Sequence, residues 1–398
     1  MENKLINMPN NKKILIIGLG LIGGSIAKAL KQKLGFNNIT ALDTNEETIS
    51  HALYDRVIKE GFTTVNDSMQ KSDLVFLCTP TKLAKKYIGD IYTKLPPGSL
   101  VTDVCSTKTE IVKYADSIKS KWHEDSPASK YSSHLSPQKA SMLNDTPAFI
   151  GGHPMVGSER GGYQVSTAHL FENAYYILTP TQSSGSKNVI FMTELVKGMG
   201  GIPLILKPEE HDFITAGISH VPHIIASALV NLVMQSETED GKLKMLAAGG
   251  FKDITRIASS SPQMWENIIS SNSEQIIKIL SNYISILDNL KSDICQNNTH
   301  NIFEFFESAK SFRDSVPSAI KGLIEPLEEI YADVEDKPGI IGKIATLLGE
   351  NGINIKNINI SNNREFEQGC LKISLPDRSM ADRAYKLLSI EGYIVYKK

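Results

Sequence analysis

The segment Lys13–Gly23 reads KILIIGLGLIG, a short apolar strand that runs directly into a glycine-rich turn. Within this turn, Gly18 permits a tight bend, Gly20 lets a backbone approach a pyrophosphate, and Gly23 lets the following helix pack closely on the strand. The first N–H groups of that helix have no partner within it, so they are available to phosphate oxygens. The sequence therefore predicts a dinucleotide site, and its expected cofactor-binding residues are Gly18, Gly20, Leu21, Ile22 and Gly23.

Three further apolar strands follow this turn and alternate with helical stretches. They are expected at Ile39–Asp43, Leu74–Thr79 and Leu100–Val104, and they are rich in Ile, Val and Leu, as strands buried on both faces should be. Strand–helix–strand repetition of this kind predicts a parallel, doubly wound sheet, an α/β fold of the Rossmann type.

The carboxylate that ends the second strand indicates which dinucleotide binds. Asp43 can accept hydrogen bonds from the adenosine ribose hydroxyls and would repel a 2′-phosphate. No Arg or Lys follows it in Thr44–Glu47, so NAD is the predicted cofactor rather than NADP. A purely structural turn, with Asp43 as an ordinary cap, is the alternative, but strand, turn, helix and acid together favour the dinucleotide. Thr79, the last residue of the third strand, and Pro80 after it are expected to contact the same cofactor.

The composition of the chain narrows the class of protein. Its 398 residues exceed one ordinary core, so two or three domains are expected. A formal net charge of −2 gives no electrostatic reason to expect nucleic acid or a membrane as partner. The four cysteines are scattered without CxxC spacing, so neither a disulfide framework nor a thiolate zinc site is expected. The N-terminus is polar without the layout of a signal peptide, so the cytoplasm is the expected compartment.

The pattern along the chain predicts three domains. A polar stretch, about residues 119–144, is interpreted as a surface insertion in the dinucleotide-binding domain, residues 1–207. Long helical segments predict an all-α domain over residues 208–322, and the order β-α-β-β-α-β predicts a ferredoxin-like sandwich over residues 326–398. The strands expected after the insertion are Ala148–Gly151, Ala174–Thr179 and Pro203–Leu206, and the long helices are Asp212–Gln235, Trp265–Leu290 and Asn301–Lys321.

Several segments are polar where a packed core would not require it. DVCSTK at Asp103–Lys108 follows a parallel strand, at the edge of the sheet where ligands bind. It is followed in the chain by GGHPM at Gly151–Met155, SHVPH at Ser219–His223, GGFKDITR at Gly249–Arg256 and PQMW at Pro262–Trp265. In these motifs and their order, the chain resembles prephenate dehydrogenases up to about residue 322. The resemblance implies NAD-dependent oxidative decarboxylation of prephenate to 4-hydroxyphenylpyruvate.

The resemblance also implies roles for individual residues. His153 is the expected acceptor for the proton of the substrate hydroxyl, because neutral imidazole titrates near physiological pH. Ser106 is expected to hydrogen-bond His153 or the substrate hydroxyl, or else to serve only as a helix cap. Arg256 offers a charged fork to a substrate carboxylate. His223 and His220 are expected to face the same cleft. Their spacing also suits a metal pair, but no third ligand has suitable spacing, so no metal site is expected. Lys252 is a possible second cation.

The last domain resembles ACT domains. DKPGII at Asp336–Ile341 lies between a strand and a helix, and NGINI at Asn351–Ile355 closes that helix. ACT domains pair and bind amino acids, so the resemblance implies tyrosine as an effector of the enzyme, with a dimerisation module without ligand as the alternative. The expected regulatory residues are Asp336, Gly339, Ile341, Asn351 and Asn354.

There are three alternatives to the oxidation of prephenate. Arogenate, with an amino group in place of the side-chain keto group, is the alternative substrate. A β-hydroxyacid dehydrogenase would leave the GGHPM and SHVPH motifs unexplained. A catalytically inactive amino-acid sensor is disfavoured because His153, Ser106 and Arg256 are all present. The resemblance implies a homodimer through the helical domain.

Overall fold

The computed structural model describes residues 11–125, 147–157, 161–316, 328–335, 337–361 and 369–397. It groups the chain into two compact units, residues 1–289 and 290–398, which are described here separately. The start of the expected insertion differs from the prediction: its first residues are not a surface loop but the end of helix α4 (Thr109–Asp125). The rest of the insertion, from residue 126, lies outside the described residues, as do the expected boundary at Pro326 and Asp336.

The first unit is built on an eight-stranded sheet with the order β3-β2-β1-β4-β5-β6-β7-β8. The four strands expected first are confirmed and pair in parallel, whereas β7 runs antiparallel to β6. β3 lies at the edge and was not predicted, because its three residues contain no apolar run. The strands are β1 (Ile14–Ile17), β2 (Ile39–Leu42), β3 (Glu60–Phe62), β4 (Leu74–Leu77), β5 (Leu100–Asp103), β6 (Ala148–Pro154), β7 (Tyr175–Pro180) and β8 (Ile202–Ile205).

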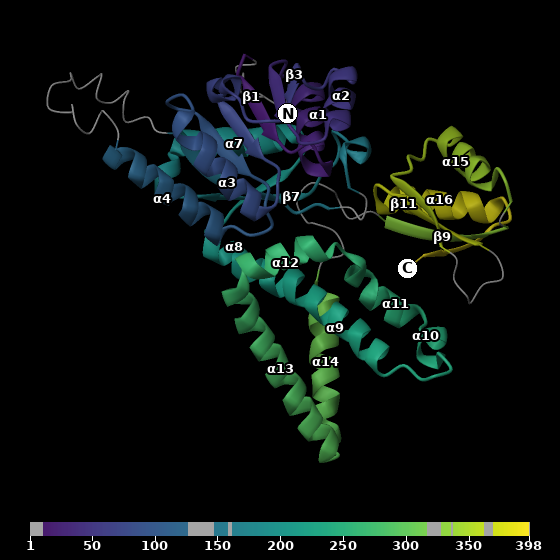
Figure 1. Cartoon of the computed structure of the whole chain (residues 1–398). Helices are drawn as coiled ribbons and strands as arrows, with labels where there is room; N and C mark the ends of the chain where they lie inside the picture. The colour runs from purple at the N-terminus through teal and green to yellow at the C-terminus, as the bar shows by residue number, and fades with distance from the viewer. Residues whose placement is uncertain are drawn as a thin grey trace. The chain divides into compact units, whose positions relative to one another are not determined.

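Alternating side chains of the strands form a separate core on each face of this sheet. Ile14 and Ile16 pack with α1 (Leu21–Gln32), α2 (Glu46–Tyr54) and α7 (Ser186–Met199). Leu15 and Ile17 pack instead with α3 (Thr81–Ile91) and α4, so helices cover both faces (Figure 1). This is the doubly wound α/β arrangement that the sequence predicts.

Helices follow the sheet in the first unit. The long helix expected at Asp212–Gln235 is divided into α8 (Pro208–Thr215) and α9 (Val221–Gln235) by a π-helical turn, Ala216–His220. The expected helix Trp265–Leu290 is likewise divided into α12 (Pro262–Ser271) and α13 (Ser273–Cys295). The shorter elements between them are α10 (Lys242–Leu246), α11 (Gly249–Thr255) and a 3-10 turn, Arg256–Ser259.

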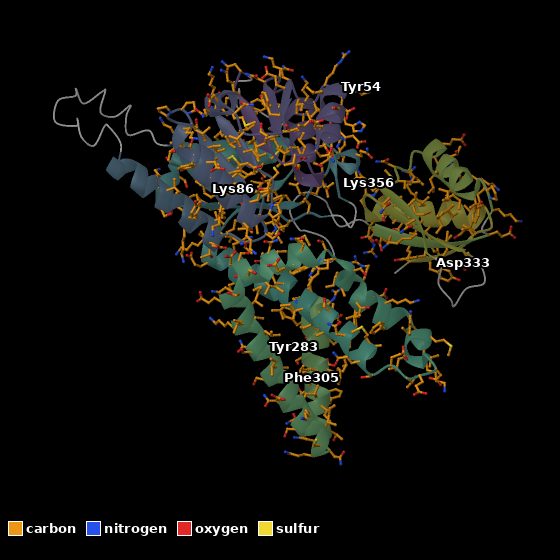
Figure 2. All side chains as sticks on the ribbon, in the orientation of Figure 1. Tyr54, Lys86, Tyr283, Phe305, Asp333 and Lys356 are labelled. Atoms are coloured by element: carbon orange, nitrogen blue, oxygen red, sulfur yellow. The ribbon has the colours of Figure 1, made fainter. Side chains whose placement is uncertain are left out.

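The second unit contains helix α14 (Thr299–Ser315) and a four-stranded antiparallel sheet with the order β10-β11-β9-β12. The sheet confirms the predicted sandwich, and its strand β10 begins at Asn357, after the NGINI motif at Asn351–Ile355. On β9, Ala332 is buried in the core, while Asp333 points to the other face (Figure 2). The elements are β9 (Glu328–Val334), α15 (Ile340–Glu350), β10 (Asn357–Ser361), β11 (Gly369–Leu375), α16 (Arg378–Ile390) and β12 (Ile394–Lys397).

Candidate active site

The glycine-rich turn has the backbone geometry of a phosphate cradle. Gly18 has φ +94°, and a Cβ on Gly23 would lie 1.9 Å from the carbonyl oxygen of Gly18. Both positions therefore require glycine. No described heavy atom lies within 4 Å of a Cβ built on Gly20, so the backbone there is open to a ligand. Gly20 precedes α1 and has no side chain to cap the first N–H groups of Leu21 and Ile22.

Two side chains beside the turn complete a site that fits a dinucleotide. The Asp43 carboxylate accepts hydrogen bonds from the backbone N–H of Leu19 at 2.7 Å and of Asn45 at 2.9 Å, which hold it at the end of β2. The hydroxyl of Thr79 is buried and has no hydrogen-bond partner among the described residues. An orphaned buried hydroxyl is expected to find a partner in a bound ligand. Pro80 follows it and precedes α3.

His153 lies near the C-terminal end of β6, next to the end of β5. Its Nδ1 is 2.8 Å from Nε2 of His211, and Nδ1 of His211 is 2.8 Å from Oδ1 of Asp212. Burial, followed by the nearby His211, Lys108 and His220, lowers the pKa of His153 well below 6.5. The ring is therefore neutral at physiological pH, as a proton acceptor must be.

The expected bond between Ser106 and His153 is not found in the part of the chain that the structure describes, where His211 is the partner of His153. The sequence reasoning missed His211 and Asp212. Their adjacency in Pro208–Asp212 was visible, but no motif connected them with His153, which is 58 positions away from His211.

A buried ion pair holds the strand that carries His153 in place. Lys108 and Asp103 have no exposed side-chain surface and form a salt bridge. Lys108 also donates to the carbonyl oxygen of Gly152 at 2.7 Å, and the Asp103 carboxylate accepts from the N–H of Gly152 at 3.1 Å and of Cys105 at 2.9 Å. The pair thus fixes the residue immediately before His153 against the end of β5.

A cavity of about 690 Å³ lies where the helical region meets the segment after β6. It brings together two predicted substrate-binding residues, His223 and Arg256, while Lys252 is exposed on α11 and does not line it. The Nδ1 of His223 donates to the carbonyl oxygen of Ser219 at 2.9 Å, which leaves Nε2 available to a ligand. The lining residues are Gly157, Gly161, His223, Arg256, Ile257, Ser259, Ser260, Ser261 and Met264.

Comparison with known proteins identifies the family. Residues 26–124 and 135–203 match the family model for the prephenate dehydrogenase nucleotide-binding domain, and residues 207–308 match its dimerization domain. Prephenate dehydrogenase from Bacillus subtilis (strain 168) is 36% identical over 374 residues, which are 93% of this chain and 94% of that protein. The chain belongs to the prephenate dehydrogenase family. Residues 329–365 match the ACT domain, so the resemblance of the last domain is confirmed as well.

Solved structures agree with this family assignment. Prephenate dehydrogenase from A. aeolicus, in complex with hydroxyphenyl propionate and NAD+, is 30% identical and has a TM-score of 0.66; the match covers 77% of this chain and 98% of that one. Synechocystis arogenate dehydrogenase is 26% identical with a TM-score of 0.63, covering 77% and 100%. This protein is therefore an oxidoreductase of the prephenate dehydrogenase family with a C-terminal ACT domain.

One residue of the family motifs lies differently from the expectation. His220 was expected to face the substrate cleft, but it is 2% exposed and its Nδ1 lies 3.2 Å from Nδ2 of Asn272. Burial lowers the pKa of His220 to about 4. The ring edge packs against Trp265, whose indole N–H is buried without a partner among the described residues. His220 is therefore not among the cavity-lining residues, whereas His223 is.

The expected regulatory residues lie around the start and end of α15. Gly339 has φ +92° and precedes the helix without a side-chain cap, so the first N–H groups have no partner from a capping side chain. Ile341 is 38% exposed, and Asn354 is exposed in the loop before β10. Asn351 accepts a hydrogen bond at its carbonyl oxygen from Arg383 at 2.7 Å. Asp336 lies outside the described residues.

Proposed function

We propose that this enzyme catalyses the NAD-dependent oxidative decarboxylation of prephenate to 4-hydroxyphenylpyruvate, a step of tyrosine biosynthesis. The observation that carries the proposal is the neutral imidazole of His153, held at the C-terminal edge of the sheet by His211. The nearby cavity offers Arg256 and His223 to a substrate with two carboxylates. The family and the 36% identity over 93% of the chain support the same reaction.

Different residues are proposed to transfer the proton and to bind the substrate in this reaction. NAD, when bound at the glycine turn, supplies the hydride acceptor. His153 takes the proton of the C4 hydroxyl as the hydride leaves C4 and the bond from C1 to the ring carboxylate breaks, which releases CO2. As the ring becomes aromatic, the proton returns to the oxygen, because the product is a phenol. Arg256 holds a carboxylate through paired N–H donors, and Ser106 is proposed to bind the substrate hydroxyl.

NAD is proposed rather than NADP because of the end of β2. Asp43 presents a carboxylate where a 2′-phosphate would lie, and Glu46 and Glu47 follow it at the start of α2. The A. aeolicus relative has been crystallised with NAD+, which supports the same choice.

Arogenate is the second candidate substrate. The relative from Synechocystis is an arogenate dehydrogenase, and its chain is fully covered by the match. The deciding experiment measures NADH or NADPH formation by the purified full-length protein with prephenate or arogenate, each with NAD or NADP. Turnover of prephenate with NAD supports the proposal; exclusive turnover of arogenate replaces it, and absence of turnover with either supports the inactive sensor.

We propose a homodimer that covers the apolar surface of the helical region. The helical stretch Pro208–Gln235 is long and apolar enough, by length and composition alone, to cross a membrane, and only 28% of its apolar window is buried. It lies in the part that matches the dimerization domain, which favours a second copy of the chain as its cover. Sedimentation at micromolar concentration tests this, and a monomer contradicts it. The exposed apolar residues of the helical region include Ile218, Leu232, Met234, Met245, Leu246 and Ile277.

We also propose that the protein is located in the cytoplasm, which cell fractionation tests.

We propose that tyrosine binds the ACT domain and inhibits the enzyme. The uncapped N-terminus of α15 beside Gly339 suits the ligand carboxylate, and Asn354 or Asp336 would meet its ammonium group. The coupling free energy between an effector site and an active site is typically about 1–3 kcal/mol. Competition at the active site is the alternative. An enzyme shortened after Leu323 that stays soluble, active and equally sensitive to tyrosine would exclude the ACT domain as the sensor.

A further inference from the structure

A chain of three side chains runs from the active-site edge of the sheet into the helical region. It consists of His153 on β6 and the adjacent His211 and Asp212 on α8, joined by contacts of 2.8 Å and 2.8 Å. His211 and Asp212 are fully buried. The other charged or titratable groups that face them are Lys108, Asp103 and His220. The resemblance of the GGHPM motif implies the role of His153, whereas no motif implies a role for the two residues behind it.

The protonation state of Asp212 determines the direction of each hydrogen bond among the three side chains. The Asp212 carboxylate accepts the backbone N–H of Lys108 at 2.7 Å and of Thr109 at 2.8 Å. Burial alone would raise the pKa of Asp212, but the hydrogen bonds from His211, Thr109 and Lys108 outweigh burial and lower it. The carboxylate is therefore ionised and has no proton to donate. Nδ1 of His211 must carry the hydrogen in its bond to Asp212.

The hydrogen bond between His211 and His153 also has a definite donor and acceptor. Burial lowers the pKa of His211, so this ring is neutral and carries only one hydrogen, on Nδ1. Its Nε2 is then an acceptor, and Nδ1 of His153 must be the donor in the bond between the two rings. Since His153 is also neutral, its Nε2 bears a lone pair and no hydrogen.

We infer that His211 and Asp212 are positioning residues that fix the tautomer of His153 and thereby make its Nε2 the base of the reaction. The inference rests on the proposed function for the identity of the proton it receives. The hydroxyl proton moves to Nε2 of His153 as the hydride leaves C4, the carbon that bears the hydroxyl, and CO2 departs. While His153 is charged, its Nδ1–H still donates to His211. The proton then returns to the phenol oxygen, so the step consumes no outside acid or base.

The opposite tautomer is disfavoured by the same geometry. A hydrogen on Nε2 of His153 would leave its Nδ1 unprotonated, opposite His211. Either two ring nitrogens without hydrogen would then face each other at 2.8 Å, or His211 would turn an unprotonated Nδ1 toward the Asp212 carboxylate at 2.8 Å. Each arrangement opposes two acceptors at a buried position, where an unmade hydrogen bond is costly.

Nitrogen NMR of the wild-type protein tests the tautomer without turnover. The nine histidines of the chain are labelled with ¹⁵N, and the His153 signals are assigned from their loss in His153→Gln. We expect the hydrogen on Nδ1 of His153 and of His211. A hydrogen on Nε2 of His153 would overturn the inference. This result is independent of the activity assay, so a wild-type enzyme that oxidises neither substrate refutes the proposed function alone.

Two substitutions of His211 separate tautomer control from packing. His211→Leu removes the acceptor, and we expect kcat to fall by about 10–100-fold, less than the ~10²–10⁴-fold typical of a general base itself. KM for prephenate and NAD should stay unchanged, because His211 is fully buried and does not line the cavity. His211→Gln places a carbonyl oxygen where Nε2 lay, so it should restore Nδ1 protonation of His153 and most of kcat.

The matched control is His169→Leu, the same change at a side chain that is 70% exposed, and it should leave kcat unchanged. Wild-type kcat in His211→Leu would overturn the inference. Equal losses in His211→Leu and His211→Gln, with the same His153 tautomer in both, would also overturn it, because His211 would then act by packing alone.

Discussion

Lys108→Met tests the buried ion pair that fastens β6 to β5. The variant keeps most of the side-chain volume but leaves Asp103 as an uncompensated charge with no exposed surface. Removing one partner of a buried pair costs roughly 3–5 kcal/mol, so the free energy of unfolding should fall by about that amount. The matched control is Lys113→Met on α4, the helix that follows Lys108; its pair with Glu209 is largely exposed at 3.5 Å and should contribute less than about 1 kcal/mol.

Urea unfolding followed by circular dichroism measures both changes on the transition that NAD shifts, because a ligand stabilises the domain that binds it. The double variant Lys108→Met/Asp103→Asn should recover part of the loss, since the buried charge is then gone, with a coupling of about 0.5–3 kcal/mol. A loss in Lys108→Met no larger than in Lys113→Met would refute the reasoning.

The same variant has a predicted effect on pH dependence. The charge of Lys108 is one of the causes that lower the pKa of His153 below 6.5. His153 acts when neutral, so activity is lost as the pH falls through this pKa. Removal of the neighbouring positive charge should raise the pKa, and the acid limb of kcat/KM should move to higher pH. An acid limb that stays in place or moves to lower pH would show that Lys108 does not act on His153.

Three further substitutions and one control, Lys252→Ala, test the proposed roles directly. His153→Asn should lower kcat by about 10²–10⁴-fold with unchanged NAD affinity in a fluorescence titration, and a near-normal kcat would remove it from the mechanism. Arg256→Ala should chiefly raise KM for prephenate, whereas Lys252→Ala, which does not alter the cavity lining, should not. An unchanged KM with a native circular dichroism spectrum would place Arg256 outside the site. Asp43→Ser should narrow the preference for NAD over NADP, and a wild-type preference for NADP would contradict that assignment.

The sequence predicts those parts of the molecule whose cause is local. Gly18 and Gly23 could be recognised because one bend and one close contact require glycine at fixed spacing. The sheet was predictable because each strand buried on both faces is an apolar run. β3 escaped because an edge strand of three residues, Glu60–Phe62, needs no such run.

Features that depend on distant contacts or helical phase could not be predicted. His220 and His223 have the spacing of one helical face, but His220 ends the π turn Ala216–His220 and is buried against Asn272, whereas His223 lies on α9. His211 and Asp212 look like ordinary polar residues in the first turns of a helix. Their role depends on the distance to His153, which only the folded chain sets.

The charges around His153 explain how a base can be neutral at rest and still be stabilised when it accepts a proton. Lys108 and Asp103 cancel each other, and Asp212 adds one negative charge, which His211 connects to His153 by hydrogen bonds. Before the reaction, burial and the nearby His211, Lys108 and His220 lower the pKa of His153, so the ring is neutral and ready to accept a proton. When it does, the imidazolium balances Asp212, and the buried group is neutral as a whole. Stabilisation that increases only as charge develops is the kind that accelerates a chemical step, because it acts on the transition state more than on the bound substrate.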